Sequence, residues 1–229
     1  MRLKAVFFDI DGTLYPNWSM YYHMIFSMIF DPLLSIRFSK ARKAIRKLDE
    51  TEQPADFKSF REKQAQIVCS YYKHHVDVSQ MERRIEKSLY KNWESSFRGV
   101  SLYNGVKPLL EFLKEKGLKV GLLSDFPIQN KLRYLGIPSS LIDYQICAED
   151  LGALKPHIRP FKAISEISEC DPNEILYVGN SYSKDIVGAK NAGMITAHLT
   201  KKKVENSVAD ITFKDYIALK EKIQKLIIF

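Results

Sequence analysis

Two aspartates, Asp9 and Asp11, stand one residue apart near the start of the chain and lead directly into Gly12 and Thr13. Residues 4–9 are typical of a buried strand, because a short run rich in Val and Phe stops abruptly at a charge. Open α/β sheets bind their ligands beyond this end of their strands. Carboxylates this close together repel each other and are stabilised by sharing a cation, so the pattern predicts a magnesium-dependent site. A strand end followed by a turn would explain Gly12 and one aspartate, but not the second.

Further polar groups stand at the ends of later predicted strands or in the loops between them. They are Ser124, Asp125, Lys155, Asn180 and Asp185. Taken singly, a hydroxyl, a lysine or a Gly-Asn turn is more often structural than catalytic. Together with the first two aspartates they supply a nucleophilic carboxylate, an acid, a hydroxyl donor, a cation and metal-binding oxygens. We therefore expect these groups to converge on one crevice.

The composition is that of an ordinary soluble globular protein. The chain has 229 residues, of which 45% are hydrophobic and 27% charged, enough for one large domain or two modest ones. Its net charge of +8 would suit an anionic partner such as a nucleic acid or a phosphorylated substrate. The basic residues are spread along the chain without a nucleic-acid-binding motif, so we expect no nucleic acid partner.

The start of the chain and its cysteines predict a cytoplasmic location. Residues 1–9 lead straight into a strand and do not form a secretion signal. Three widely spaced cysteines lack the spacing of a metal site and are expected to be reduced. The apolar stretch 20–38 is split at Asp31-Pro32, which predicts two short helices and no membrane span. An interfacial role for Trp18 and its neighbours is the alternative.

Strand and helix signals alternate at both ends of the chain but not in its middle. Helical spacing of apolar residues predicts helices at 19–30, 33–48, 54–76 and 79–97, the last with Ser79 as its N-cap. Further helices are predicted at 105–116, at 128–135 and from 215, and strands near 118–124, 142–147, 174–179, 194–199 and 210–213. This alternation predicts an α/β fold with a doubly wound parallel sheet. Residues 1–15 and 99–229 would form the core, and residues 16–98 an inserted, all-helical cap domain.

In this order the motifs resemble those of the haloacid dehalogenase superfamily of phosphohydrolases. The match covers residues 3–15 and 99–200 in detail and the helical insertion only in kind. The resemblance implies a Rossmann-like core, a cap that closes over it and Mg²⁺ as cofactor. It assigns Asp9 as the nucleophile that attacks phosphorus and forms an aspartyl-phosphate. It assigns Asp11 as the general acid and base, with its backbone carbonyl on the metal.

The resemblance also implies roles for the later motifs. Ser124 would bind the phosphoryl group, together with the amide of Asp125, and Lys155 would offset the charge on the nucleophile. The expected substrate-binding residues are Gly12, Thr13, Asp125 and, at the entrance to the cap, Tyr15 and Trp18. The expected metal ligands are Asp9, Asp11, Asn180 and Asp185. Next to Lys155, His157 and Arg159 could touch a phosphate or could simply be solvated.

Asn180 departs from the family pattern, which usually has an acid directly after the glycine. An amide oxygen can still bind Mg²⁺, but the replacement removes one negative charge from the site. A non-catalytic module that binds a phosphorylated ligand through a degenerate metal site is therefore one alternative.

Asp11 separates two chemistries within the superfamily. Dehalogenases lack this second acid, because a halide leaves without a proton, whereas the alkoxide that leaves a phosphate ester benefits from a general acid. We therefore predict a magnesium-dependent phosphomonoester hydrolase, with a phosphomutase as the alternative. The substrate would be a small phosphorylated metabolite of the phosphoglycolate, sugar-phosphate or nucleotide type, and the protein would be a monomer or homodimer.

Overall fold

The computed structural model describes residues 3–18, 31–91, 97, 99–128 and 130–228, and the structural statements below concern these residues. The helix predicted over 19–30 lies outside them. Within the described ranges, no helix is both long and apolar enough to cross a bilayer. The three cysteines are unpaired thiols.

The core is one parallel sheet of six strands in the order β3-β2-β1-β4-β5-β6. Its strands are β1 (Ala5–Phe8), β2 (Lys119–Ser124), β3 (Tyr144–Cys147), β4 (Ile175–Gly179), β5 (Ile195–Leu199) and β6 (Ile211–Phe213). The central strands β1 and β4 are buried along their whole length, as expected of a parallel sheet covered on both faces. Apolar residues therefore follow one another in these strands without alternation.

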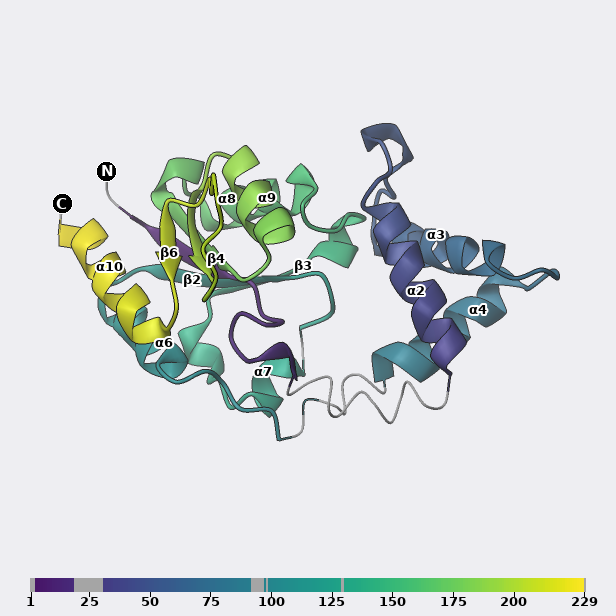
Figure 1. Ribbon diagram of the computed structural model, residues 1–229, viewed down its shortest axis with the longest axis horizontal. Coiled ribbons are helices and arrows are strands. Elements are labelled where there is room, and N and C mark those ends of the chain that lie inside the picture. Colours follow the sequence, from purple (N-terminus) through teal and green to yellow (C-terminus); the bar gives the residue numbers. More distant parts are fainter. Residues whose placement is uncertain (1–2, 19–30, 92–96, 98, 129, 229) are drawn as a thin grey trace.

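Helices cover both faces of this sheet (Figure 1). On one face lie α6 (Val106–Glu115), α7 (Lys131–Tyr134) and α10 (Tyr216–Ile228), and on the other lie α8 (Ile158–Ser168) and α9 (Val187–Asn191). Each face has its own apolar core, the first centred on leucines of α6 and the second on Phe161, Ile164 and Tyr177. Short turns of 3₁₀ or π helix complete the core: η3 (Ser139–Leu141), η4 (Ala148–Leu151), η5 (Pro172–Glu174) and η6 (Tyr182–Ile186).

The order of the strands places the sequence motifs together. From β1 the chain continues to β2 and β3 on one side of the sheet, and later returns to β4 and β5 on the other. The loops after β1, β2 and β4 therefore leave neighbouring strands at the same edge and diverge there. Such a switch point opens a crevice at the carboxyl ends of the strands, where α/β proteins bind their ligands.

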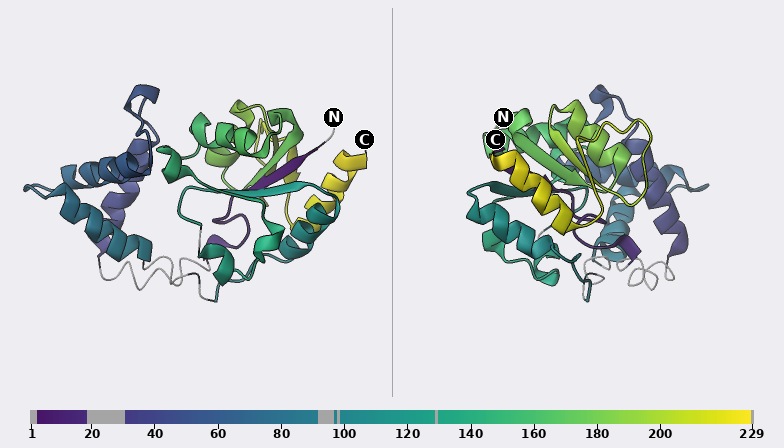
Figure 2. Two further views of the ribbon diagram at one scale, coloured as in Figure 1. Left: turned by 180° about the vertical axis from the view of Figure 1, so that it is seen from behind. Right: turned by 60° about the vertical axis from the view of Figure 1, so that its left-hand side comes forward.

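The segment inserted after β1 is helical and stands beside this edge, at the end of the molecule opposite both termini (Figure 2). It contains α2 (Pro32–Ile45), η1 (Glu50–Glu52), α3 (Phe57–Ser70), α4 (Val78–Ile85) and the π turn η2 (Glu86–Tyr90). Its apolar core joins Leu34, Val68 and Met81 from three of these helices. We call this segment the cap.

The predicted fold class is confirmed, whereas several element boundaries were wrong. The helix predicted at 54–76 is limited to α3, because Asp56 caps its start by accepting the Ser59 amide and the chain turns at Tyr71. The predicted N-cap of the next helix, Ser79, lies inside α4. Asp77 is the cap instead, since its carboxylate accepts the amide of Gln80 at 2.8 Å.

Candidate active site

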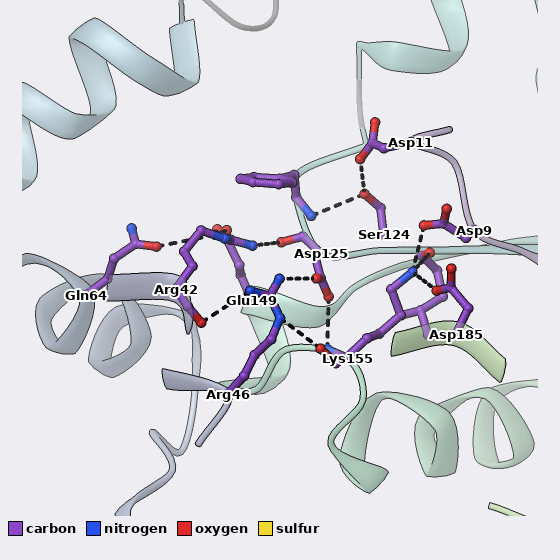
Figure 3. Close-up of polar contacts among 12 residues, drawn as sticks. Asp9, Asp11, Arg42, Arg46, Gln64, Ser124, Asp125, Glu149, Lys155 and Asp185 are labelled. Carbon is purple, nitrogen blue, oxygen red and sulfur yellow. Dashed lines mark hydrogen bonds and ion pairs between the residues drawn. The ribbon is translucent and has the colours of Figure 1, made fainter. Parts of the chain in front are cut away.

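The centre of the site is a lysine held between two carboxylates. Asp9 follows β1 and is only 5% exposed. Lys155 Nζ lies 2.6 Å from Asp9 Oδ1 and 2.7 Å from Asp185 Oδ1 (Figure 3). Lys155 comes from the loop after η4 and Asp185 from η6, so three distant segments meet here. The predicted grouping of these residues is what the structure shows.

Burial dominates the electrostatics of this group. It raises the pKa of Asp9 to about 7, and although the charge of Lys155 opposes this, repulsion from Asp185 and Asp11 adds to it. Burial alone would lower the pKa of Lys155, but Asp185 and Asp9 together raise it well above the ordinary value. Lys155 is therefore charged. A further positive charge beside Asp9 would favour the ionised, nucleophilic form of Asp9.

A tyrosine completes the surroundings of this lysine. Tyr177 is fully buried in β4, and its hydroxyl accepts a hydrogen bond from Lys155 Nζ at 3.2 Å. Its ring packs edge-on against Phe161 of α8, with 5.2 Å between centroids. Because the ring is fixed by packing, the hydroxyl is a rigid support for Lys155. Sequence reasoning missed this role, since a tyrosine in an apolar strand is indistinguishable from a core residue.

Thr13 orients the second carboxylate oxygen of Asp9. Its hydroxyl donates to Asp9 Oδ2 at 2.7 Å and accepts the backbone amide of Asn180 at 3.1 Å. The turn before it requires glycine: Gly12 has φ of +88°, and a Cβ there would approach Asn180 Nδ2 to 2.4 Å. The loops after β1 and β4 are therefore locked together at Asn180. Thr13, which the sequence predicts to bind substrate, is thus hydrogen-bonded to Asp9 and Asn180 of the protein itself.

Asp11 lies on the other side of the crevice with three donors around it. The hydroxyl of Tyr15 donates to Asp11 Oδ1 at 2.5 Å, and Ser124 Oγ lies 3.3 Å from Oδ2. Lys131 Nζ lies 3.0 and 2.8 Å from the two oxygens, and 3.2 Å from Ser124 Oγ. Two of the predicted site residues, Asp11 and Ser124, thus lie in contact, and Lys131, which the sequence did not single out, contacts both. Trp18, by contrast, is 73% exposed and, among the described contacts, has none with this group.

Asp125 connects the core to the cap. Its Oδ1 accepts the backbone amide of Lys155 at 2.9 Å, and its Oδ2 pairs with Arg46 of α2 at 2.7 Å. Burial alone would raise the pKa of Asp125, but the charges of Lys155, Arg46 and Arg42 lower it to about 2. Arg42 also donates to the backbone carbonyl of Asp125 at 2.7 Å. The side chain of Asp125 therefore joins the core loops to the cap, while the predicted role in substrate binding belongs to its backbone amide.

A second group of contacts holds the cap against the loops after β3. Arg42 pairs with Glu149 of η4, which is fully buried and also accepts the hydroxyl of Tyr90 at 2.8 Å. His157 and Arg159 face the cap: both pair with Glu50, at 2.6 and 3.1 Å. Neither residue is therefore simply solvated, and contact of either with a phosphate stays a prediction.

The oxygen donors of the crevice fit a hard divalent cation. Asp9 and Asp185 supply carboxylates, and Asn180 Oδ1 lies 3.3 Å from the Thr13 hydroxyl that also bonds Asp9. Within the ranges that the structure describes, no three His, Cys, Asp or Glu side chains are grouped as a metal site. A Mg²⁺ ion would instead need the amide of Asn180, a backbone carbonyl and water to complete its oxygen shell.

A cavity of about 790 Å³ lies between cap and core, and Lys131, which pairs with Asp11, is part of its lining. Phe57, Arg61 and Tyr90 line it from the cap, and Phe126, Lys131 and Gln145 from the core. Its volume and its mixture of aromatic and cationic side chains suit a small polar ligand.

The comparisons with known proteins agree with this arrangement. The model of the haloacid dehalogenase-like hydrolase family matches residues 3–193, so the chain belongs to this family. It is 31% identical to a glyceraldehyde 3-phosphate phosphatase of Methanothermobacter thermautotrophicus, over 96% of this chain and 99% of the relative. It is 26% identical to the pyrophosphatase PpaX of Bacillus cereus, over 86% and 83% of the two chains.

The fold is shared with solved structures of both dehalogenases and phosphatases. A 2-haloacid dehalogenase of Pseudomonas syringae superposes with a TM-score of 0.68 at 22% identity, over 97% of this chain and 99% of that one. The prediction of a haloacid dehalogenase-like hydrolase is confirmed, and the curated relatives place the phosphatase assignment ahead of the dehalogenase one.

Proposed function

We propose that the protein is a magnesium-dependent phosphomonoester hydrolase that acts through an aspartyl-phosphate on Asp9. The observation that carries the proposal is the environment of the two aspartates. Asp9 is held by Lys155 and Thr13 at hydrogen-bond distance, and Asp11 stands across the crevice beside Ser124. One carboxylate is thus held by a lysine and a hydroxyl, while the other pairs with Lys131, which lines the cavity.

In the first step, an oxygen of Asp9 attacks phosphorus and the bond from phosphorus to the ester oxygen breaks. Asp11 gives its proton to the leaving oxygen and becomes a carboxylate. In the second step, Asp11 takes a proton from water as that water attacks the phosphorus. The bond to Asp9 then breaks, inorganic phosphate leaves, and both aspartates return to their starting forms. Lys155 offsets the negative charge beside Asp9 throughout.

Asp9, Asp185, the amide of Asn180 and the backbone carbonyl of Asp11 would hold Mg²⁺. When bound, the ion would supply positive charge beside the phosphoryl oxygens and so reduce their repulsion from Asp9. The raised pKa of Asp9 supports this assignment, because the site has too little positive charge to keep a buried carboxylate fully ionised at neutral pH.

The substrate would be a small phosphorylated metabolite. Two curated relatives are named for glyceraldehyde 3-phosphate and for pyrophosphate, which are both small. The cavity lined by Lys131 also has the volume of a small-molecule site. Phosphoglycolate, sugar phosphates and nucleotides belong to the same class and form the panel to test.

The test is release of inorganic phosphate from this panel and from an aryl phosphate, with and without Mg²⁺. We expect release that requires Mg²⁺ and is abolished by Asp9→Asn, because an amide cannot act as the nucleophile. Asp49→Asn is the matched control, since Asp49 is exposed and its side chain forms no capping hydrogen bond. Phosphate release that survives in Asp9→Asn, or a folded wild type that releases none, would overturn the proposal. The second outcome would favour a binding module.

A further inference from the structure

We propose that Lys131 binds the substrate: it pairs with Asp11 in the arrangement that the structure shows, and it donates to the phosphate ester once substrate binds. This inference rests on the proposed function, because it names a further residue of the same site. Lys131 belongs to none of the motifs from which that function was argued.

The position of Lys131 brings it within reach of the phosphoryl group. Its Nζ lies 3.2 Å from Ser124 Oγ, the hydroxyl proposed to bind a phosphoryl oxygen. Two donors this close together can donate to one acceptor oxygen, since each forms hydrogen bonds of about 2.7–3.0 Å. Lys131 also lines the cavity between cap and core, which has the volume of a small-molecule site.

The surroundings of Lys131 require an anion beside it. The residue is only 4% exposed, and its Nζ lies 5.3 and 5.7 Å from the ring centroids of Phe97 and Phe126. Removing an ammonium group from water is costly unless an opposite charge compensates. Asp11 provides that charge in the present arrangement, at 2.8 Å. A phosphate ester can replace it there without leaving the lysine unpaired.

Donors from three segments meet at this position. Tyr15, Ser124 and Lys131 all donate toward Asp11. When Lys131 turns to the substrate, it adds a positive charge to the phosphate-binding site, while the hydroxyl of Tyr15 stays beside Asp11.

The test is a double-mutant cycle on the binding of inorganic phosphate, measured by calorimetry at constant Mg²⁺ concentration. Lys131→Met should weaken phosphate binding roughly tenfold or more, because a charged hydrogen-bond donor is lost. Lys107→Met, which changes an exposed lysine of α6, should leave it unaltered. Asp11→Asn alone should strengthen phosphate binding several-fold, because phosphate then no longer competes with the Asp11 carboxylate for Lys131.

That gain should disappear when Asp11→Asn is combined with Lys131→Met, because the two residues are coupled. A gain that persists in the double variant would reflect general charge repulsion and would overturn the proposal. So would wild-type phosphate affinity in Lys131→Met, which would leave Lys131 as a residue that only positions Asp11. If Lys131→Met does not fold, Lys131→Gln serves in its place with the same criteria.

The cycle measures binding and not turnover, so its outcome is separate from that of the proposed function. Coupled phosphate binding in a protein that hydrolyses nothing would support Lys131 and reject the hydrolase. Hydrolysis without coupled phosphate binding would support the hydrolase and reject the proposed role of Lys131.

Discussion

Arg46 of cap helix α2 forms an ion pair with Asp125 of the core, with 2.7 Å between Nη2 and Oδ2. The Nε of the same arginine donates to the backbone carbonyl of Lys155 at 2.9 Å. Asp125 directly follows Ser124, so one cap side chain contacts two of the loops that carry the site. The cap and the loops after β2 and η4 are therefore coupled through Arg46.

Arg46→Met should lower kcat/KM several-fold to tenfold while changing the free energy of unfolding by only about 0.5–1.5 kcal/mol. The activity falls because the loops after β2 and η4 lose a common anchor, whereas the pair itself is partly solvated, with side chains 16% and 10% exposed. Steady-state kinetics and urea unfolding measure the two effects. Arg84→Met is the control, since Arg84 pairs with Asp31 wholly within the cap. Equal activity losses in both variants would contradict this role of Arg46.

Asp125 should make the protein sensitive to acid. Its pKa is about 2 in the folded state against an ordinary value of 3.8, so the folded state favours the carboxylate. The stabilisation is fully present above about pH 4 and is lost as the pH falls through 2. By linkage this amounts to roughly 2 kcal/mol. Asp125→Asn should therefore reduce the loss of unfolding free energy between pH 7 and pH 3, whereas Asp49→Asn should run parallel to the wild type.

The convergence of Asp9, Asp11, Ser124 and Asp185 could be predicted from the sequence, because they stand at or after the ends of the apolar strands β1, β2 and β4. Lys155 lies in the loop after η4 and is expected at the site only from the order of the motifs. Because the strands are parallel, their carboxyl ends lie at the same edge of the sheet. The polar residues that follow these strands are therefore brought together there. The cap helices could be recognised from their periodicity, but their ends could not. Those ends depend on side-chain caps such as Asp56 and Asp77, which a run of polar residues does not single out.

Lys131 could not have been predicted, because nothing distinguishes it from the many other lysines of a basic chain. Its importance comes from burial between aromatic rings that belong to separate segments. The same holds for Arg42 and Arg46, which resemble the solvated face of an amphipathic helix. They contact the core only because the cap stands over the loops after β2 and β3.

Tyr177→Phe should reduce kcat roughly ten- to hundredfold with little change in KM. The hydroxyl that supports Lys155 is lost, and a hydrogen bond to a charged group contributes about 1.5–3 kcal/mol, of which each 1.4 is tenfold in rate. Tyr144→Phe is the control, because Tyr144 stacks on Phe7 in the core, with 6.0 Å between centroids. Both variants should unfold cooperatively near the wild-type midpoint. A wild-type kcat in Tyr177→Phe would show that packing alone positions Lys155.

Asn180 offers the sharpest test of the metal site. Its amide oxygen lies beside the Thr13 hydroxyl that bonds Asp9, so Asn180→Asp would place a negative charge next to the nucleophile and across from Asp185. We expect Mg²⁺ to bind more tightly, with higher activity at low Mg²⁺ and a smaller difference at saturation. If the site is tuned to the neutral amide, the added charge will instead repel the substrate phosphate and raise its KM. The measurement is a magnesium titration of activity in both proteins under matched conditions, with Asn206→Asp as a control on the β5–β6 connection, far along the chain from these motifs. Identical curves for wild type and Asn180→Asp would remove Asn180 from the metal site and leave it as a turn residue after β4.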